Sequence, residues 1–307
     1  MIISATRRTD LPAFYAAWFM NRVRAGFAAV PNPFNARQVA RISLAPEQAE
    51  AIVFWTRDPR PLLPHLAELT DRGFRYYFQF TLLEYPAPLH PGMPPLKERL
   101  DAFKGLAQAI SPERVLWRYD PVILSARTDT DFHRRSFEAL ARALRGSTGR
   151  VTVSLLEPYR KGRARLNAAG VDLLAPGEAE LAALFTDLAG MARSFGMAPA
   201  SCADEAGLDL LGFAPGACVD GELIARLTGR PAPPEKDPFQ RAACRCAPSK
   251  DIGMYDGCPA GCAYCYATRN FARAVRNQQA HDPASPSLLG WHEPPDEAAD
   301  GQGALSL

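Results

Sequence analysis

The stretch RVLWRYDP, residues 114–121, carries the pattern that decides the fold. Its apolar and aromatic residues are typical of a short, buried β-strand. Arg118 interrupts this apolar run, and an unpaired charge inside a strand is costly to bury. We therefore expect Arg118 either to face the opening of an active site or to pair with a carboxylate such as Asp120.

Five further runs share this character and alternate with helical patterns. They are IIS near Ile2, AIVFW ending at Trp55, RYYFQFTL ending at Leu82, RVTVSLL ending at Leu156 and APASCA around Cys202. Strands that alternate with helices require right-handed crossovers and a parallel sheet. The sequence therefore predicts an α/β fold, a partial or full TIM-like (β/α) barrel of about six parallel strands.

Apolar residues at helical spacing predict the helices between these strands. The first follows Asp10, which stands as an N-cap before Pro12. Others are expected over residues 96–110, 132–144, 178–195 (ending at Gly196) and 222–227, and from about Tyr266 onward. The stretch AGFAAVPNPFNARQVARISL, residues 25–44, breaks this rhythm and predicts a β-hairpin insertion after the first helix.

Composition divides the chain into three parts. Residues 1–206 form the predicted barrel, and residues 207–281 form a Cys-rich iron–sulfur segment that we expect to pack on the barrel mouth. Residues 282–307 are rich in Pro, Ala, Ser, Gly and acidic residues, which predicts a mobile tail.

Polar residues gather where the predicted strands end. Parallel α/β folds place their active sites at the carboxyl ends of the strands, so these residues are the candidates for chemistry. Any single one of them has an ordinary explanation as a strand or helix cap, but together they favour an active site. The candidate catalytic residues are Arg8, Asp10, Arg118, Asp120 and Glu205. Arg7 and Arg57 join Arg8 and Arg118 as candidate ligands for a carboxylate or phosphate.

The composition of the chain limits the classes of protein. A chain of 307 residues with 47% hydrophobic content can bury a core without disulfides, so its seven cysteines are free for other chemistry. The start of the chain does not resemble a signal peptide, and no apolar run approaches the ~18 residues of a membrane helix. We expect a cytoplasmic protein without a membrane partner. The net charge of +2 neither indicates nor excludes nucleic acid.

Three cysteines stand close together in CPAGCAYC, residues 258–265. Cys262 and Cys265 have the spacing of half a zinc site, with Cys244 and Cys246 as an irregular second half, but this leaves Cys258 unused. The common ferredoxin spacings do not match. Three thiolates on one loop instead suit a [4Fe–4S] cluster with one iron open to an external ligand.

This Cys-x3-Cys-x2-Cys motif, with Tyr264 before its last cysteine, resembles that of the radical S-adenosylmethionine (SAM) superfamily. The resemblance implies a six-unit partial barrel and a [4Fe–4S] cluster on Cys258, Cys262 and Cys265. SAM would bind the open iron, and its reductive cleavage would give a 5′-deoxyadenosyl radical that abstracts hydrogen from a substrate. It also implies Gly261, Tyr264 and Tyr266 as candidate cofactor-binding residues, and an electron donor such as flavodoxin or ferredoxin.

The order of the motif differs from that superfamily, in which the cysteines follow the first strand. Here they follow the last strand, so the chain would be a circularly permuted relative. Residues 1–290 more closely resemble an uncharacterised bacterial domain-of-unknown-function family, which starts with an ISASRRTDIPAFY-like segment and ends with this cysteine cluster. That resemblance implies the cluster more directly than it implies radical chemistry.

The four other cysteines are Cys202, Cys218, Cys244 and Cys246. Four thiolates would complete a second iron–sulfur cluster or a zinc site. The alternative is that Cys202 and Cys218 are buried apolar residues, as unpaired cysteines often are.

Three functions remain open from the sequence. The first is a radical SAM enzyme acting on a small-molecule substrate, with the strand-end arginines favouring an anionic one. The second is an iron–sulfur electron-transfer or sensor protein without SAM chemistry. The third is a zinc-stabilised nucleic-acid-binding protein, for which the basic runs at residues 160–166 and 269–277 are the candidate contacts, although such runs are usually solvated faces.

Overall fold

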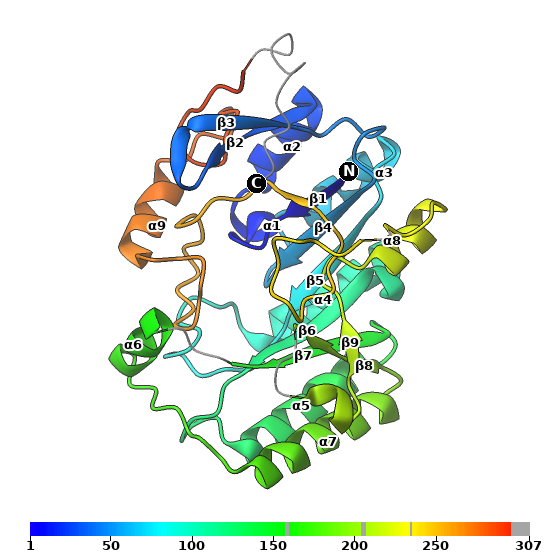
Figure 1. Cartoon of the computed structure of the whole chain (residues 1–307), viewed down its shortest axis with the longest axis vertical. Helices are drawn as coiled ribbons and strands as arrows, with labels where there is room; N and C mark the ends of the chain where they lie inside the picture. Colours follow the sequence, from blue (N-terminus) through cyan, green and yellow to red (C-terminus); the bar gives the residue numbers. More distant parts are fainter. Residues whose placement is uncertain (157–159, 204–206, 234, 296–307) are drawn as a thin grey trace.

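The computed structural model describes residues 1–156, 160–203, 207–233 and 235–295, except for the side chains of residues 160 and 161. In this part of the chain, eight parallel strands form one sheet in the order β10-β1-β4-β5-β6-β7-β8-β9 (Figure 1). Their bounds are β1 Ile2–Ala5, β4 Ala51–Thr56, β5 Tyr76–Thr81, β6 Val115–Val122, β7 Arg150–Leu155, β8 Ala198–Cys202, β9 Ala214–Gly216 and β10 Lys250–Asp251.

All six strands predicted from the sequence are present, and they are the six central strands of this sheet. The short outer strands β9 and β10 were not predicted. No ladder joins β9 to β10 within the described residues, so the sheet is open at these two edges. The α/β class with a parallel sheet is therefore confirmed, whereas closure into a barrel is not.

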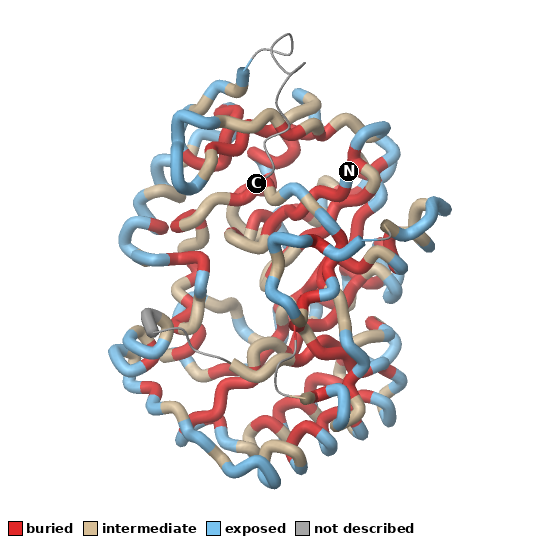
Figure 2. Tube along the Cα trace, in the orientation of Figure 1, coloured by how far each residue is buried: buried red, intermediate tan, exposed pale blue. Residues whose placement is uncertain are grey.

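Helices cover one face of the sheet. Alternate strand residues point to opposite faces, and Ile52 and Phe54 of β4 lie in the main apolar core with Trp18 and Phe103 from the helices. The buried residues concentrate in the central strands and on the helix surfaces that face them (Figure 2). The covering helices are α1 Leu11–Phe14, α2 Ala16–Ala25, α3 Leu66–Asp71, α4 Leu96–Ile110, α5 Thr130–Leu144 and α7 Glu178–Ser194.

The opposite face carries a smaller apolar cluster. Val53 of β4 and Tyr77 of β5 point into it and meet Leu223 and Ile224 of α8 (Gly221–Thr228). Cys218, Cys244 and Cys246 belong to the same cluster. This face therefore receives the Cys-rich part of the chain instead of a layer of long helices.

Each predicted helix is present, and two of them differ from the prediction for local reasons, whereas the short helix α3 and helix α6 (Arg160–Ala168) were not predicted. The predicted first helix is divided at Tyr15, whose backbone leaves the helical region between α1 and α2. The last helix, α9 (Phe271–Gln279), begins at Phe271 and not near Tyr266. Asn270 caps it through Arg273 N, while the Arg269 and Asn270 amides donate to Asp256 and hold the preceding residues in a loop.

The remaining elements are local. The insertion predicted over residues 25–44 is an antiparallel hairpin of β2 Phe27–Asn32 and β3 Asn35–Ser43. Helix α6, Arg160–Ala168, follows β7, and the 3-10 turns are Leu63–His65, Pro112–Arg114 and Leu208–Leu211. Among the described residues, no helix is both long enough and apolar enough to cross a membrane.

The chain after Asp282 differs from the predicted mobile tail as far as it is described. Ser285, Ser287 and Leu288 are buried. The Trp18 indole donates to the Ser285 carbonyl at 2.9 Å, and Ala29 N donates to the Pro286 carbonyl at 2.8 Å. These contacts tie the segment to α2 and to the hairpin, so composition alone misjudged its packing.

The buried side chain of His133 gives the fold a pH dependence. Its Nε2 lies 3.0 Å from the Ile123 carbonyl and its Nδ1 lies 2.8 Å from the Tyr119 hydroxyl, so the ring is held neutral with Nδ1 as acceptor. Burial lowers the pKa of His133 to about 4. The unfolded chain binds this proton near pH 6.5, so the free energy of unfolding should fall as the pH drops from 6.5 to 4, by about 3 kcal/mol in total.

We expect His133→Gln to remove most of this part of the pH dependence. The measurement is urea unfolding of both proteins at several pH values between 4 and 7.5. The difference between the two proteins isolates His133 from the other groups that titrate in this range. If the free energy of unfolding depends on pH in the same way in both proteins, the assignment of this pH dependence to His133 is wrong.

Candidate functional site

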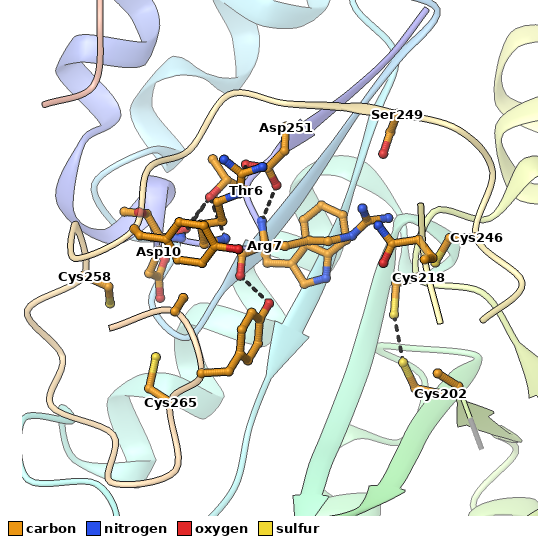
Figure 3. Close-up of a pocket in the computed structure, with 18 of the residues that line it drawn as sticks. Thr6, Arg7, Asp10, Cys202, Cys218, Cys246, Ser249, Asp251, Cys258 and Cys265 are labelled. Atoms are coloured by element: carbon orange, nitrogen blue, oxygen red, sulfur yellow. Dashed lines mark hydrogen bonds and ion pairs between the residues drawn. The ribbon is translucent and has the colours of Figure 1, made fainter. Parts of the chain in front are cut away.

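A cavity of about 1580 Å³ opens at the carboxyl ends of the strands. All seven cysteines line it, in two groups. Figure 3 shows Cys258 and Cys265 on one side and Cys202, Cys218 and Cys246 on the other. Of the other candidates from the sequence, those that line the cavity are Arg7, Arg8, Asp10, Arg57, Arg118, Asp120, Tyr264 and Tyr266. Glu205 lies outside the described residues.

Asp251 in β10 fixes the start of the cysteine loop against β1. Its Oδ2 accepts hydrogen bonds from Ser4 Oγ at 2.7 Å and from Arg7 N at 2.9 Å, and its Oδ1 accepts from Gly253 N. Strand β10 pairs in parallel with β1, so the C-terminal segment enters the cavity beside the first strand. The end of the chain that carries the motif thus reaches the same edge of the sheet as its beginning.

Close backbone packing continues toward the first cysteine. Thr9 Oγ1 donates to the Met254 carbonyl at 2.7 Å, and the Tyr15 hydroxyl donates to the Gly257 carbonyl at 2.5 Å. A Cβ atom on Gly253 would lie 2.2 Å from Thr6 Oγ1. The sequence DIGMYDG therefore needs its glycines for close approach to the β1–α1 loop.

The loop from Cys258 to Cys265 turns sharply. Gly261 has a φ of +75°, and a side chain there would also meet Pro91 at 3.0 Å. Cys265 N donates to the Cys262 carbonyl at 3.0 Å, which closes a tight turn. Burial raises the pKa of Cys258 to about 12 and also raises the pKa of Cys262. Gly261 does not line the cavity, so it does not reach a cofactor there. Its positive φ instead allows the loop to turn between Cys258 and Cys262.

Arg57, the residue after β4, contacts this loop through Tyr264. Its Nη2 donates to the Tyr264 hydroxyl at 2.7 Å and its Nη1 lies 2.8 Å from His90 Nε2. A guanidinium only donates, so His90 Nε2 is the acceptor. Burial, together with the charge of Arg57, holds the pKa of His90 well below its usual range. Tyr264 therefore packs within the core of the loop, whereas the Tyr266 ring is exposed and its hydroxyl donates to the Arg7 carbonyl.

Asp10 joins three elements beside the cysteine loop. Its Oδ1 accepts from Ala13 N, which caps α1, and from Thr56 Oγ1 at 2.7 Å. Its Oδ2 accepts from Arg57 N at 2.8 Å. Burial raises the pKa of Asp10 to about 6, although these hydrogen bonds oppose the shift. Arg8 contacts Asp251 at 3.8 Å and stacks on Tyr255.

Arg118 lies on the other side of the cavity and is paired with Asp120, one of the two outcomes expected from the sequence. Ser154 of β7 also donates to Asp120. The second arm of Arg118, Nη1, donates to Cys218 Sγ at 2.7 Å. This buried guanidinium therefore joins a carboxylate to a cysteine.

The four remaining cysteines contact one another in a chain. The Cys202 and Cys218 sulfurs are 3.3 Å apart, Cys218 contacts Cys246, and Cys246 contacts Cys244. Hydrogen bonds from the Cys202 and Cys246 thiols, together with Arg118, hold the pKa of Cys218 well below its usual range. Within the described residues, no group of three or more His, Cys, Asp or Glu side chains is placed so that it could hold a metal ion.

Sequence reasoning missed several residues that build this site. His90 follows a Pro-rich stretch with no motif around it, and Asp251 stands in a two-residue strand too short to leave a pattern. Arg165 belongs to a basic run that suggests a solvated face, yet it donates to the carbonyls of Cys265 and Thr268. The only available signal for Arg165 was its place after the fifth predicted strand.

Fold and site together define an α/β protein with a cysteine-lined cavity at the carboxyl edge of a parallel sheet. The family model described as "Domain of unknown function (DUF1848)" matches residues 2–267, so the chain belongs to this family. The expected membership of a domain-of-unknown-function family is thereby confirmed, and the match includes the three-cysteine loop. No curated protein and no solved structure matches the chain.

The contact between Gly253 and Thr6 predicts the effect of a small substitution. Gly253→Ala should lower the free energy of unfolding by about 1–3 kcal/mol, because the added methyl group overlaps Thr6. Gly105→Ala is the control: Gly105 is exposed within α4 and has open space around it, so alanine should stabilise the helix by about 0.5–1 kcal/mol. Urea unfolding followed by circular dichroism measures both. A Gly253→Ala protein as stable as the parent would contradict the close packing of this segment.

Proposed function

We propose that the protein is a radical SAM-type enzyme in which Cys258, Cys262 and Cys265 bind a [4Fe–4S] cluster. The observation that carries the proposal is that all three thiols line a cavity of about 1580 Å³, which exceeds the ~300–1,000 Å³ of most small-molecule sites. Such a cavity has room for SAM and a substrate together. When bound, the cluster would supply the electron that cleaves SAM to methionine and a 5′-deoxyadenosyl radical.

The residues around the loop suit such a cluster. Three thiolates bring negative charge into a buried site, and the buried guanidinium of Arg57 beside Cys262 offsets part of it. Gly261 and the turn from Cys262 to Cys265 bring the cysteines onto one short loop. Arg165 fixes the far end of the loop through the Cys265 and Thr268 carbonyls. These residues hold and orient the ligands and leave the cavity side of the loop open.

The polar residues of the cavity would position the substrate. Asp120 and Ser154 form a hydrogen-bonded pair at the ends of β6 and β7, within the cavity wall. Arg8 and Arg118 also line the cavity and favour a substrate with an anionic group. The proposal includes a sheet curved as a partial barrel, a reducing cytoplasmic setting, and an electron donor such as flavodoxin or ferredoxin.

The other two functions have less support. An electron-transfer or sensor protein needs a cluster but has no need of a large cavity beside it. A nucleic-acid-binding role would use the basic runs at residues 160–166 and 269–277. In the first run Arg165 is engaged in holding the cysteine loop, and in the second Arg269 and Asn277 donate hydrogen bonds to Asp256.

Electron paramagnetic resonance tests the proposal directly. We expect protein reconstituted and reduced without oxygen to give a reduced-cluster signal whose g-values shift when SAM is added, because SAM binds the open iron. Cys262→Ala should abolish this SAM-sensitive signal and remove about four iron ions per chain.

Ser249→Ala is the control, since it changes a side chain that lines the same cavity outside both cysteine groups and should keep the SAM-dependent shift. A cluster signal that ignores SAM would favour electron transfer or sensing. A Cys262→Ala protein with the full iron content and an unchanged spectrum would overturn the ligand assignment.

A further inference from the structure

We propose that Cys202, Cys218, Cys244 and Cys246 bind a single zinc ion in a closed four-thiolate site, separate from the three-cysteine loop. This inference does not depend on what the three-cysteine loop binds. It rests on how the fold gathers these four side chains, on the spacing of their sulfurs and on the charges that face them.

The fold brings the four cysteines together from three segments. Cys202 ends β8 and pairs with Gly216, the last residue of β9, so Cys218 lies two residues beyond the end of that strand. Cys244 and Cys246 come from the chain before β10. Ala247 N donates to the Val219 carbonyl at 2.9 Å and so holds this chain against the residue after Cys218.

The sulfur spacing favours one ion over a second cubane cluster. In a tetrahedral zinc site, with Zn–S of ~2.3 Å, the ligand sulfurs lie about 3.8 Å apart. Cys202 and Cys218 are 3.3 Å apart, and each of the other two thiols contacts another member of the set. A cubane binds each thiolate at a different iron and needs the four sulfurs much farther apart. The side chains as placed form no group of three that could hold a metal ion, so zinc binding requires the thiols to turn toward a common centre.

The surrounding charges match such a centre. Four thiolates and a divalent ion carry a net charge of −2, and two guanidinium groups face the set. Arg118 donates to Cys218 Sγ at 2.7 Å. The Nη2 atom of Arg7 is buried and has no hydrogen-bond partner among the described residues, and Cys246, Cys218 and Asp251 are electrostatic partners of the Arg7 guanidinium. Figure 3 shows Arg7 between the two cysteine groups.

The alternative reading is that these cysteines are neutral core residues. Cys218, Cys244 and Cys246 do lie in an apolar cluster with Val219 and Leu223. However, neutral thiols would leave the partly buried Arg7 guanidinium with Asp251 but no thiolate among its electrostatic partners, and a charge that is incompletely paired is costly to bury. A four-thiolate zinc site removes that cost and also cross-links β8, β9 and the segment that leads to β10.

Metal analysis of the purified full-length chain tests the inference. We expect about one zinc ion per chain, retained in the triple variant Cys258→Ala/Cys262→Ala/Cys265→Ala and lost in Cys244→Ala/Cys246→Ala. If the triple variant retains zinc, the zinc site does not use the three loop cysteines. The zinc proposal can therefore hold even if the proposed radical SAM function is wrong. Because cysteine variants can misfold, the parent protein is also loaded with cobalt(II), which should give the thiolate charge-transfer and d–d bands of a tetrahedral four-sulfur site.

Two neighbouring arginines provide a matched pair for a zinc-chelator competition. Arg7→Met should weaken zinc binding by about tenfold, because it removes a facing charge. Arg8→Met should change it little, since Arg8 contacts Asp251. A parent protein that binds neither zinc nor cobalt at these thiols would overturn the proposal. So would a triple variant that takes up about four iron ions after iron–sulfur reconstitution, because this would mean a second cubane.

Discussion

The hydrogen bonds of Asp251 are the constraint on which the site depends. A single carboxylate binds Ser4 Oγ, Arg7 N and Gly253 N, and so fastens the C-terminal strand β10 to β1. Without that pairing, the chain that leads to the cysteines would lose its register with β1, and the contacts of Thr9, Arg57 and Arg165 would have to hold the loop by themselves. A contact between residues about 250 positions apart thus places the loop at the edge where parallel α/β folds carry out chemistry.

The charged side chains that line the cavity lie in two regions, one around each group of cysteines. Around the three-cysteine loop, Arg57 is committed to Tyr264 and His90, and Asp10 is committed to α1 and β4. Around the four-cysteine set, Arg118 joins Asp120 to Cys218, and the buried Nη2 atom of Arg7 has no hydrogen-bond partner among the described residues. This separation is the physical reason for treating the seven cysteines as three plus four.

The central fold was predictable from the sequence because runs such as those ending at Trp55 and Tyr119 are long, apolar and repeated. The outer strands β9 and β10 were not, since three or two residues carry no readable pattern. The pairing of Arg118 with Asp120 followed from the cost of burying a charge. By contrast, His90, Asp251 and Arg165 act through contacts with residues distant in sequence, which no local motif indicates. The segment near Ser285 has the composition of a tail, yet its backbone carbonyls accept hydrogen bonds from α2.

The central claim is that one cavity holds two different thiolate metal centres. Anomalous X-ray scattering, measured on both sides of the iron and zinc absorption edges with crystals grown without oxygen, tests it most directly. The account predicts an iron signal bonded to Cys258, Cys262 and Cys265 and a separate zinc signal bonded to Cys202, Cys218, Cys244 and Cys246. Iron at both positions, or no metal at either, would contradict it.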